Sequence, residues 1–237
     1  MDNSYLERYS VIDNKNPREI LLLRGSGCAW RKCRFCDYHL DSCKDSKENF
    51  NINKKAIEQV IGKYGVLEVV NSGSFVDLDE DTMQLLMNTC KDKSIKQIHF
   101  ESHWMHRDDI ALLRERFAKI GVRTKLKIGV ETFDYLFRES YLVKGIDTDS
   151  PSEIAKYFDE VCLLFGIPGQ TEESMLYDIK TGLKYFDRVC INIMQKNSKA
   201  ILPDPRVIEI FRDKIYDKYI ENDRVDILMV NTDFGIG

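Results

Sequence analysis

Short apolar runs alternate with longer amphipathic stretches along most of the chain. Each run is rich in Ile, Leu and Val and is bounded by polar residues or glycine, a pattern typical of buried β-strands. The predicted strands are Glu19–Arg24, Val66–Asn71, Ile95–Glu101, Val122–Glu131, Glu160–Gly166, Arg188–Met194 and Val225–Val230. Helical patterns lie between them at Lys54–Tyr64, Glu80–Lys91, Asp108–Ile120, Phe133–Val143, Glu172–Tyr185 and Pro205–Ile220. Asp79 and Thr171 are predicted N-caps, because carboxylates follow each of them in the next turn.

This alternation of strand and helix predicts an α/β fold with a parallel sheet, and continuously apolar strands suit a sheet covered on both faces. Either a doubly wound sheet or a full or partial (βα) barrel fits the number of repeats. In both folds, function lies on the loops that follow the carboxyl ends of the strands. No Gly/Ser linker or charge block marks a boundary, so we expect one domain over residues 1–237, with a core at about 19–195 and a C-terminal helix, strand and tail on the substrate side.

Composition narrows the class of protein. The chain has 237 residues, 43% of them hydrophobic, and a formal net charge of −4. This charge argues against a strongly basic nucleic-acid-binding face, although a local basic patch remains compatible with it. No run of 18 apolar residues occurs, and the polar segment Met1–Asn16 lacks the apolar part of a signal peptide. We therefore expect a cytoplasmic protein without a membrane partner, whose thiols stay reduced.

The cysteines are the strongest chemical signal in the sequence. Cys28, Cys33 and Cys36 fall within nine residues, directly after the first predicted strand. Thiolates at this density bind zinc or an iron–sulfur cluster. A closed zinc site would take His39 or Cys43 as its fourth ligand, whereas a four-iron cluster would use the three cysteines and leave one iron open. The cysteines within apolar stretches are predicted to be core residues: Cys90, Cys162 and Cys190.

This loop resembles that of the radical S-adenosylmethionine (SAM) superfamily. The family pattern is a three-cysteine loop after the first strand of a partial (βα)6-type barrel, usually C-x3-C-x2-C with an aromatic residue before the last cysteine. Here the spacing is C-x4-C-x2-C, and Phe35 takes the aromatic position. The resemblance implies that Cys28, Cys33 and Cys36 ligate a [4Fe–4S] cluster whose open iron binds SAM. It also implies cleavage of SAM to a 5′-deoxyadenosyl radical, with an electron donor such as flavodoxin or ferredoxin.

Four later segments, each at the end of a predicted strand, resemble the SAM-binding segments of the same family and occur in the same order. The third of them, Gly129-Val-Glu131-Thr with Lys144-Gly145 further on, resembles the G-x-E-T…K-G pattern of the tRNA-modifying branch. The cofactor-binding residues implied are Phe35, Ser72, Gly73 and Ser74 (aminocarboxyl end), Glu101 and His103 (ribose), Glu131, and Gly166, Ile167 and Pro168 (adenine). Backbone N–H groups at a Gly-rich turn suit a carboxylate, and a carboxylate suits ribose hydroxyls.

The barrel accounts for nearly the whole chain, and no second cysteine cluster is present. A small free substrate is therefore favoured over a macromolecule. The resemblance to the nucleoside-modifying branch implies a 7-deazaguanine base: a lyase of this kind cleaves a C–N bond of queuine and releases its precursor preQ1, as in queuosine salvage. Two alternatives remain open, namely a radical SAM enzyme that modifies a tRNA base or another nucleoside, and a zinc-binding module without enzymatic activity.

The tail after the last predicted strand is expected to fold over the barrel mouth. Asp233 is the candidate for the base edge, because a carboxylate matches the N–H donors of a 7-deazaguanine in a two-point contact. Phe234 is the candidate stacking or lid residue. Asn231 and Tyr38 are candidates for polar contacts with the substrate.

Overall fold

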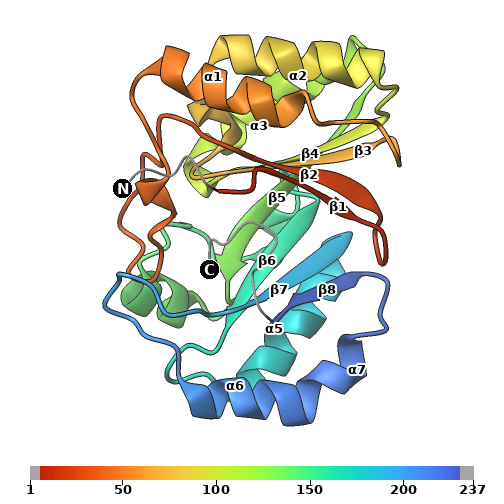
Figure 1. The fold of residues 1–237 in the computed structure, drawn as a ribbon. Coiled ribbons are helices and arrows are strands. Elements are labelled where there is room, and N and C mark those ends of the chain that lie inside the picture. The colour runs from red at the N-terminus through yellow and green to blue at the C-terminus, as the bar shows by residue number, and fades with distance from the viewer. Residues whose placement is uncertain (1–5, 230–237) are drawn as a thin grey trace. The chain divides into compact units, whose positions relative to one another are not determined.

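The computed structural model describes residues 6–229 and divides into two compact units (Figure 1). Of the described residues, unit 1 comprises 6–31 and Tyr38–Leu126, and unit 2 comprises Lys32–Asp37 and 127–229. The single domain expected over residues 1–237 stays a prediction. None of the described helices is long and apolar enough to cross a membrane.

Unit 1 is built on β1 (Tyr9–Ile12), β2 (Arg18–Leu23), β3 (Val66–Asn71) and β4 (Gln97–Glu101). Strand β1 pairs with β2 in antiparallel fashion, and the β2–β3 and β3–β4 pairs are parallel. One face of this sheet is covered by α1 (Ser46–Ile57), α2 (Glu80–Asp92) and α3 (Ile110–Ala118) (Figure 1). Short 3-10 turns follow the strands at Tyr38–Leu40 (η1), Phe75–Asp77 (η2) and Trp104–Asp109 (η3).

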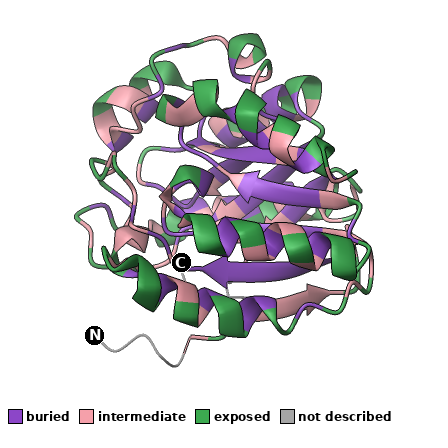
Figure 2. Ribbon diagram, turned by 90° about the horizontal axis from the view of Figure 1, so that it is seen from above, coloured by how far each residue is buried: buried purple, intermediate pink, exposed green. Residues whose placement is uncertain are grey.

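The core of unit 1 lies between this sheet and its helices. Every residue of β2 is buried, and Phe100 of β4 packs against Phe117 of α3 with ring centroids 5.4 Å apart. Strands β2, β3 and β4 are buried along most of their length, while β1 is half-buried; the helices are exposed along their outer side (Figure 2). The period of 3.6 residues in the helices produces this separation of apolar and polar faces.

Unit 2 contains most of β5 (Arg123–Glu131), together with β6 (Glu160–Phe165), β7 (Arg188–Ile193) and β8 (Val225–Leu228), all parallel. Its helices are α4 (Pro151–Ile154), α5 (Glu172–Tyr185), α6 (Pro205–Phe211) and α7 (Asp217–Tyr219), with π-helical turns at Phe137–Leu142 (η4) and Arg212–Tyr216 (η5). At the amino ends of the strands, buried Arg188 donates to Glu160 at 2.8 Å and to Asp226 at 3.0 Å. This triad clamps the starts of β6, β7 and β8.

All seven predicted strands are present, and both predicted N-caps are confirmed: Asp79 accepts from Thr82 N, and Thr171 accepts from Ser174 N. The predicted bounds of the first helix are wrong, because α1 begins at Ser46, where Asp45 caps it, and ends at Ile57. The antiparallel strand β1 and the short helix α4 were not predicted. Their sequences are too short for a periodic pattern to be distinct.

The helix predicted over Phe133–Val143 is confirmed in shorter form: residues 135–142 are helical, and Phe137–Leu142 are π-helical (η4). The fully buried Arg138 side chain donates to the carbonyl oxygens of Thr132, Ile146 and Thr148, so it ties η4 to the segments on either side of it. The predicted helix over Pro205–Ile220 is interrupted by the π-helical turn η5.

Candidate active site

The candidate site residues fall into two sets, one in each unit. In unit 1, the cysteine loop begins after β2 and is closed at its base. Gly25 forms an isolated parallel bridge with Ser42, and Cys43 N donates to Gly25 O at 3.1 Å. Asn49 of α1 holds both ends of the loop, since it accepts from Arg24 Nε at 2.9 Å and donates to Cys43 O at 2.8 Å. The first turns of α1 therefore fix where the loop leaves and rejoins the fold.

A second asparagine, Asn53, lies one turn further along α1 and is fully buried. Its Oδ1 accepts from Arg24 N at 2.7 Å, and its Nδ2 donates to Arg24 O at 2.9 Å and to Thr82 Oγ1 at 3.2 Å. Neither asparagine stands out as a site residue in the sequence. The only signal is their spacing of four, which places both on one face of a helix directly after the cysteine loop.

The far side of the loop is braced by Asp41. Its carboxylate receives two hydrogen bonds from buried Arg8, at 2.8 and 3.1 Å, and its backbone oxygen accepts from Ser72 Oγ at 2.6 Å. The carbonyl oxygen of Ser72 in turn accepts from Cys28 N at 3.2 Å. Ser72 thus connects the end of β3 to the backbone of the first cysteine.

The Gly-rich turn after β3 is held by Asp77. Asp77 Oδ2 accepts from Ser74 N at 2.7 Å, and Asp77 O accepts from Ser26 N at 2.9 Å. Only glycine fits at position 73, because a Cβ there would clash with the Asp77 carboxylate and lie 3.0 Å from Cys28 N. Since Gly73 N donates to Asn71 O, the N–H groups of Gly73 and Ser74 are bonded within the protein. Their assignment to the carboxylate of SAM stays a prediction.

At the end of β4, the two predicted ribose residues are differently exposed. Glu101 is half-buried, whereas His103 is buried, donates its backbone N–H to Ser74 Oγ at 2.9 Å and accepts from Met105 N through Nδ1 at 3.2 Å. The Trp30 ring stacks on the His103 ring, with centroids 5.5 Å apart and 19° between the planes. Trp30 lies in the first gap of the cysteine loop, so this gap places an aromatic side chain at the end of β4. No sequence signal distinguished it.

In unit 2, the part of the loop that carries Cys33 and Cys36 packs against an apolar cluster. Buried Phe35 anchors it, and both cysteines contact the cluster. The other buried members are Leu142, Ile167, Met194 and Ile201. Phe35 O accepts from Asn197 Nδ2 at 2.6 Å. Phe35, the residue at the aromatic position of the family pattern, thus anchors the part of the loop that carries Cys33 and Cys36.

Glu131 and Lys144 form a buried ion pair beside that anchor. Lys144 Nζ donates to Glu131 Oε1 at 2.7 Å, and the side chains are 14% and 9% exposed. Lys144 Nζ also lies 5.6 Å from the centroid of the Phe35 ring. Burial alone would lower the pKa of Lys144, but the Glu131 carboxylate and the thiolates of Cys33 and Cys36 raise it well above its usual range. The charged form of Lys144 is therefore favoured at this buried position.

The β6 segment adopts a tight turn after the strand. Gly166 has φ +95°, and its carbonyl oxygen accepts from Asp204 N at 2.8 Å. Ile167 is fully buried, and its N–H donates to Gln170 Oε1 at 2.9 Å, while Pro168 is partly exposed. Gly166 needs to be glycine, since a Cβ would lie 2.8 Å from Ile208 Cγ1. Its predicted contact with adenine stays a prediction.

The remaining predicted residues are placed as follows. Tyr38 is half-buried at the start of η1, and Asn231, Asp233 and Phe234 lie outside the described residues. The predicted core cysteines are confirmed as buried: Cys90, Cys162 and Cys190. Burial raises the pKa of the Cys90 thiol to about 12.

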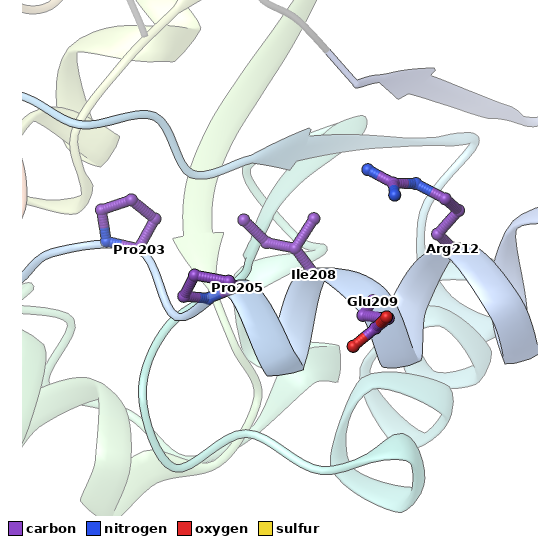
Figure 3. Close-up of a pocket in the computed structure, with 5 residues that line it drawn as sticks. All are labelled: Pro203, Pro205, Ile208, Glu209 and Arg212. Atoms are coloured by element: carbon purple, nitrogen blue, oxygen red, sulfur yellow. The ribbon is translucent and has the colours of Figure 1, made fainter.

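A surface depression of about 410 Å³ lies along the start of α6 (Figure 3). It is lined by Pro203, Pro205, Ile208, Glu209 and Arg212. None of these is a predicted site residue, so the depression has no part in the assignment of the site.

The donor set fits an iron–sulfur cluster. Cys28, Cys33 and Cys36 form no disulfide and are partly exposed, and Cys33 and Cys36 pack against the cluster around Phe35, whose ring lies 5.6 Å from Lys144 Nζ. Cys43, the possible fourth zinc ligand, is engaged at the start of α1, where its Sγ lies 3.4 Å from Glu48 Oε2 and accepts from Asp45 N at 3.4 Å. Within residues 6–229, no three His, Cys, Asp or Glu side chains are grouped so as to hold a single metal ion.

A scan against protein-family models finds no match, and a search of curated proteins finds none. Among solved structures, the chain is similar to queuine lyase from Clostridium spiroforme bound to SAM and queuine. The identity is 41% and the TM-score 0.92, with 98% of this chain and 99% of that chain covered. This likeness confirms the predicted α/β partial barrel and defines the chain as a radical SAM enzyme. At this identity and coverage, the chain belongs to the queuine lyase family.

Proposed function

We propose that this chain is a radical SAM lyase that uses a [4Fe–4S] cluster and SAM to cleave a C–N bond of queuine, with preQ1 as the product. One observation carries the proposal: nearly the whole chain matches an enzyme solved with SAM and queuine, at 41% identity. The three cysteines of the loop supply the thiolate ligands that the cluster of such an enzyme needs, and the hydrogen bonds to the loop hold its backbone in place. A cytoplasmic location and a reductant such as flavodoxin or ferredoxin complete the proposal.

Cys28, Cys33 and Cys36 are the residues that would hold the cluster. When bound, the cluster and SAM supply a 5′-deoxyadenosyl radical that abstracts hydrogen from the substrate. The protein binds and orients the cofactor and the substrate and excludes water from them, because the difficult chemistry belongs to the cofactor. Its contribution at the cysteine loop is rigidity, provided in unit 1 by Asn49 and in unit 2 by Phe35.

The SAM-binding residues we propose come from four strand ends. Ser72, Gly73 and Ser74 shape the turn after β3, and the half-buried Glu101 lies at the end of β4, where a carboxylate suits ribose hydroxyls. The remaining residues proposed to contact SAM are His103, Glu131, Gly166, Ile167 and Pro168.

For the substrate, we propose Asp233 as the partner of the base edge, Phe234 as a stacking residue, and Asn231 and Tyr38 as polar contacts. The Asp233→Asn variant tests the first of these. It keeps the size of the side chain but loses the carboxylate, so we expect queuine to bind at least tenfold more weakly with SAM binding unchanged. Unchanged queuine affinity would remove Asp233 from the site.

The central experiment is anaerobic reconstitution of the cluster, followed by addition of SAM, a reductant and queuine and analysis by mass spectrometry. We expect 5′-deoxyadenosine and preQ1, and neither from the triple Cys28/Cys33/Cys36→Ala variant. Formation of 5′-deoxyadenosine with intact queuine would replace queuine by a nucleoside or tRNA substrate. Zinc in the purified protein without SAM cleavage would refute the proposal as a whole.

A further inference from the structure

Lys144 and Glu131 form a buried ion pair beside Phe35, and contact of Glu131 with SAM does not by itself require a buried lysine there. A lysine is costly to bury, and this one is 14% exposed. Its ammonium donates to Glu131 at 2.7 Å and lies over the ring of Phe35, the residue directly before Cys36. The cation is thus positioned from one side by a carboxylate and from the other by the cysteine loop.

The backbone around Lys144 is fixed as well. Val143 and Gly145 both have positive φ, 57° and 76°, so the chain reverses sharply on either side of the lysine. Glu139 accepts from Gly145 N at 2.6 Å and from Ile146 N at 3.1 Å, and Lys144 N donates to Arg138 O at 3.2 Å. A left-handed conformation at a β-branched residue such as Val143 is unfavourable and persists only where the surroundings impose it. The position of the ammonium is therefore set by the fold.

A fixed charge near a redox centre has a defined effect. Reduction of a cluster adds one negative charge, and a nearby cation stabilises that charge more strongly in a poorly solvated site. The carboxylate of Glu131 acts in the opposite sense but is itself neutralised by Lys144. The reduction potential of the cluster therefore depends on the balance between the positive charge of Lys144 and the negative charge of Glu131.

We propose that Lys144, oriented by Glu131, is a positioning residue that raises the reduction potential of the cluster that Cys28, Cys33 and Cys36 would hold. The proposal rests on the cluster of the proposed function but is independent of the substrate. It makes Glu131 the partner that limits this effect, in addition to any contact with SAM. The consequence is that opposite charge changes at the two positions shift the potential in opposite directions.

The test is a redox titration of the reconstituted cluster without SAM or queuine, followed by the electron paramagnetic resonance signal of the reduced cluster. For Lys144→Met, we expect the ratio of reduced to oxidised cluster at a given solution potential to fall roughly tenfold, which is a shift of about 59 mV for one electron. Glu131→Gln should shift the ratio in the opposite direction. Lys144→Arg keeps the charge and is the matched control, expected to stay close to the wild-type protein.

Iron and sulfide content, measured on each variant, separates loss of the cluster from a change in its potential. A Lys144→Met protein with a full cluster and an unchanged potential would overturn the proposal. If that variant holds no cluster, the Glu131→Gln titration decides, and an unshifted or lowered potential there overturns it. A wild-type protein without a cluster would instead refute the proposed function, whereas failure to cleave queuine leaves the redox result intact.

Discussion

The two halves of the candidate site are stabilised by different kinds of interaction. In unit 1, asparagine side chains and one serine bond to backbone groups of the cysteine loop, with Asn53 alone contributing two such bonds to Arg24. In unit 2, the loop rests on an apolar cluster beside buried charges, namely Lys144 with Glu131 and Arg138 with Glu139. Unit 1 therefore fixes backbone shape, and unit 2 provides charge in a poorly solvated setting.

The largest effect should come from the charged half. Arg138→Met removes a fully buried guanidinium that binds Glu139 and three carbonyl oxygens, so the carbonyl oxygens lose this donor and Glu139 loses its charge partner. We expect the free energy of unfolding to fall by about 3–5 kcal/mol, measured by urea denaturation. The surface pair of Arg116 with Glu80 is the control, and Arg116→Met should cost about 0–1 kcal/mol. If both variants lost the same free energy of unfolding, the burial of Arg138 would not increase its contribution to stability.

The neutral half should give a smaller loss. Asn53→Ala removes the partner of Arg24 N and of Arg24 O and one of the hydrogen bonds of Thr82 Oγ1, and we expect a loss of about 2–3 kcal/mol together with weaker retention of iron. Asn51→Ala changes an exposed residue of the same helix and should alter stability by less than about 0.5 kcal/mol. If the Asn53 variant kept both its stability and its iron, α1 would have no role in holding the loop.

A pH effect should arise next to η4, where burial raises the pKa of the Asp178 carboxyl from 3.8 to about 7, against the opposing hydrogen bond from Phe133 N. The folded protein keeps this proton between about pH 4 and 7 while the unfolded chain releases it, so stability falls as the pH rises through that window. Asp178→Asn cannot ionise. Relative to the wild-type protein, it should become more stable by about 2–3 kcal/mol from pH 5 to pH 8. A difference that does not change with pH would contradict the raised pKa.

The smallest effect is expected from Trp30, the aromatic residue in the first gap of the cysteine loop. Trp30→Leu removes the ring that stacks on His103, and an aromatic pair of this kind contributes about 0.5–1.5 kcal/mol. We expect SAM to bind about threefold to tenfold more weakly by anaerobic calorimetry, with affinity largely restored in Trp30→Phe. Unchanged affinity for SAM in Trp30→Leu would mean that the stack of Trp30 on His103 does not contribute to SAM binding.

The sequence predicted what depends on local pattern. Apolar runs located all seven parallel strands, and the spacing of Cys28, Cys33 and Cys36 indicated the chemistry. What it did not predict depends on contacts between distant residues. Asn49 and Asn53 are poor helix formers that lie in α1 and bind Arg24, and the helix predicted around Arg138 is π-helical over Phe137–Leu142. The contact of Lys144 with Glu131 and Phe35 likewise requires three-dimensional proximity.

The Arg188 triad at the opposite ends of the strands has an evolutionary consequence. It clamps the starts of β6, β7 and β8 through Glu160 and Asp226, far along each strand from the loops that carry site residues. Mutations in those loops can accumulate without loosening the register of the sheet, because the register is secured elsewhere. A lineage with this design can acquire new substrates by exchanging loops while it inherits the same scaffold.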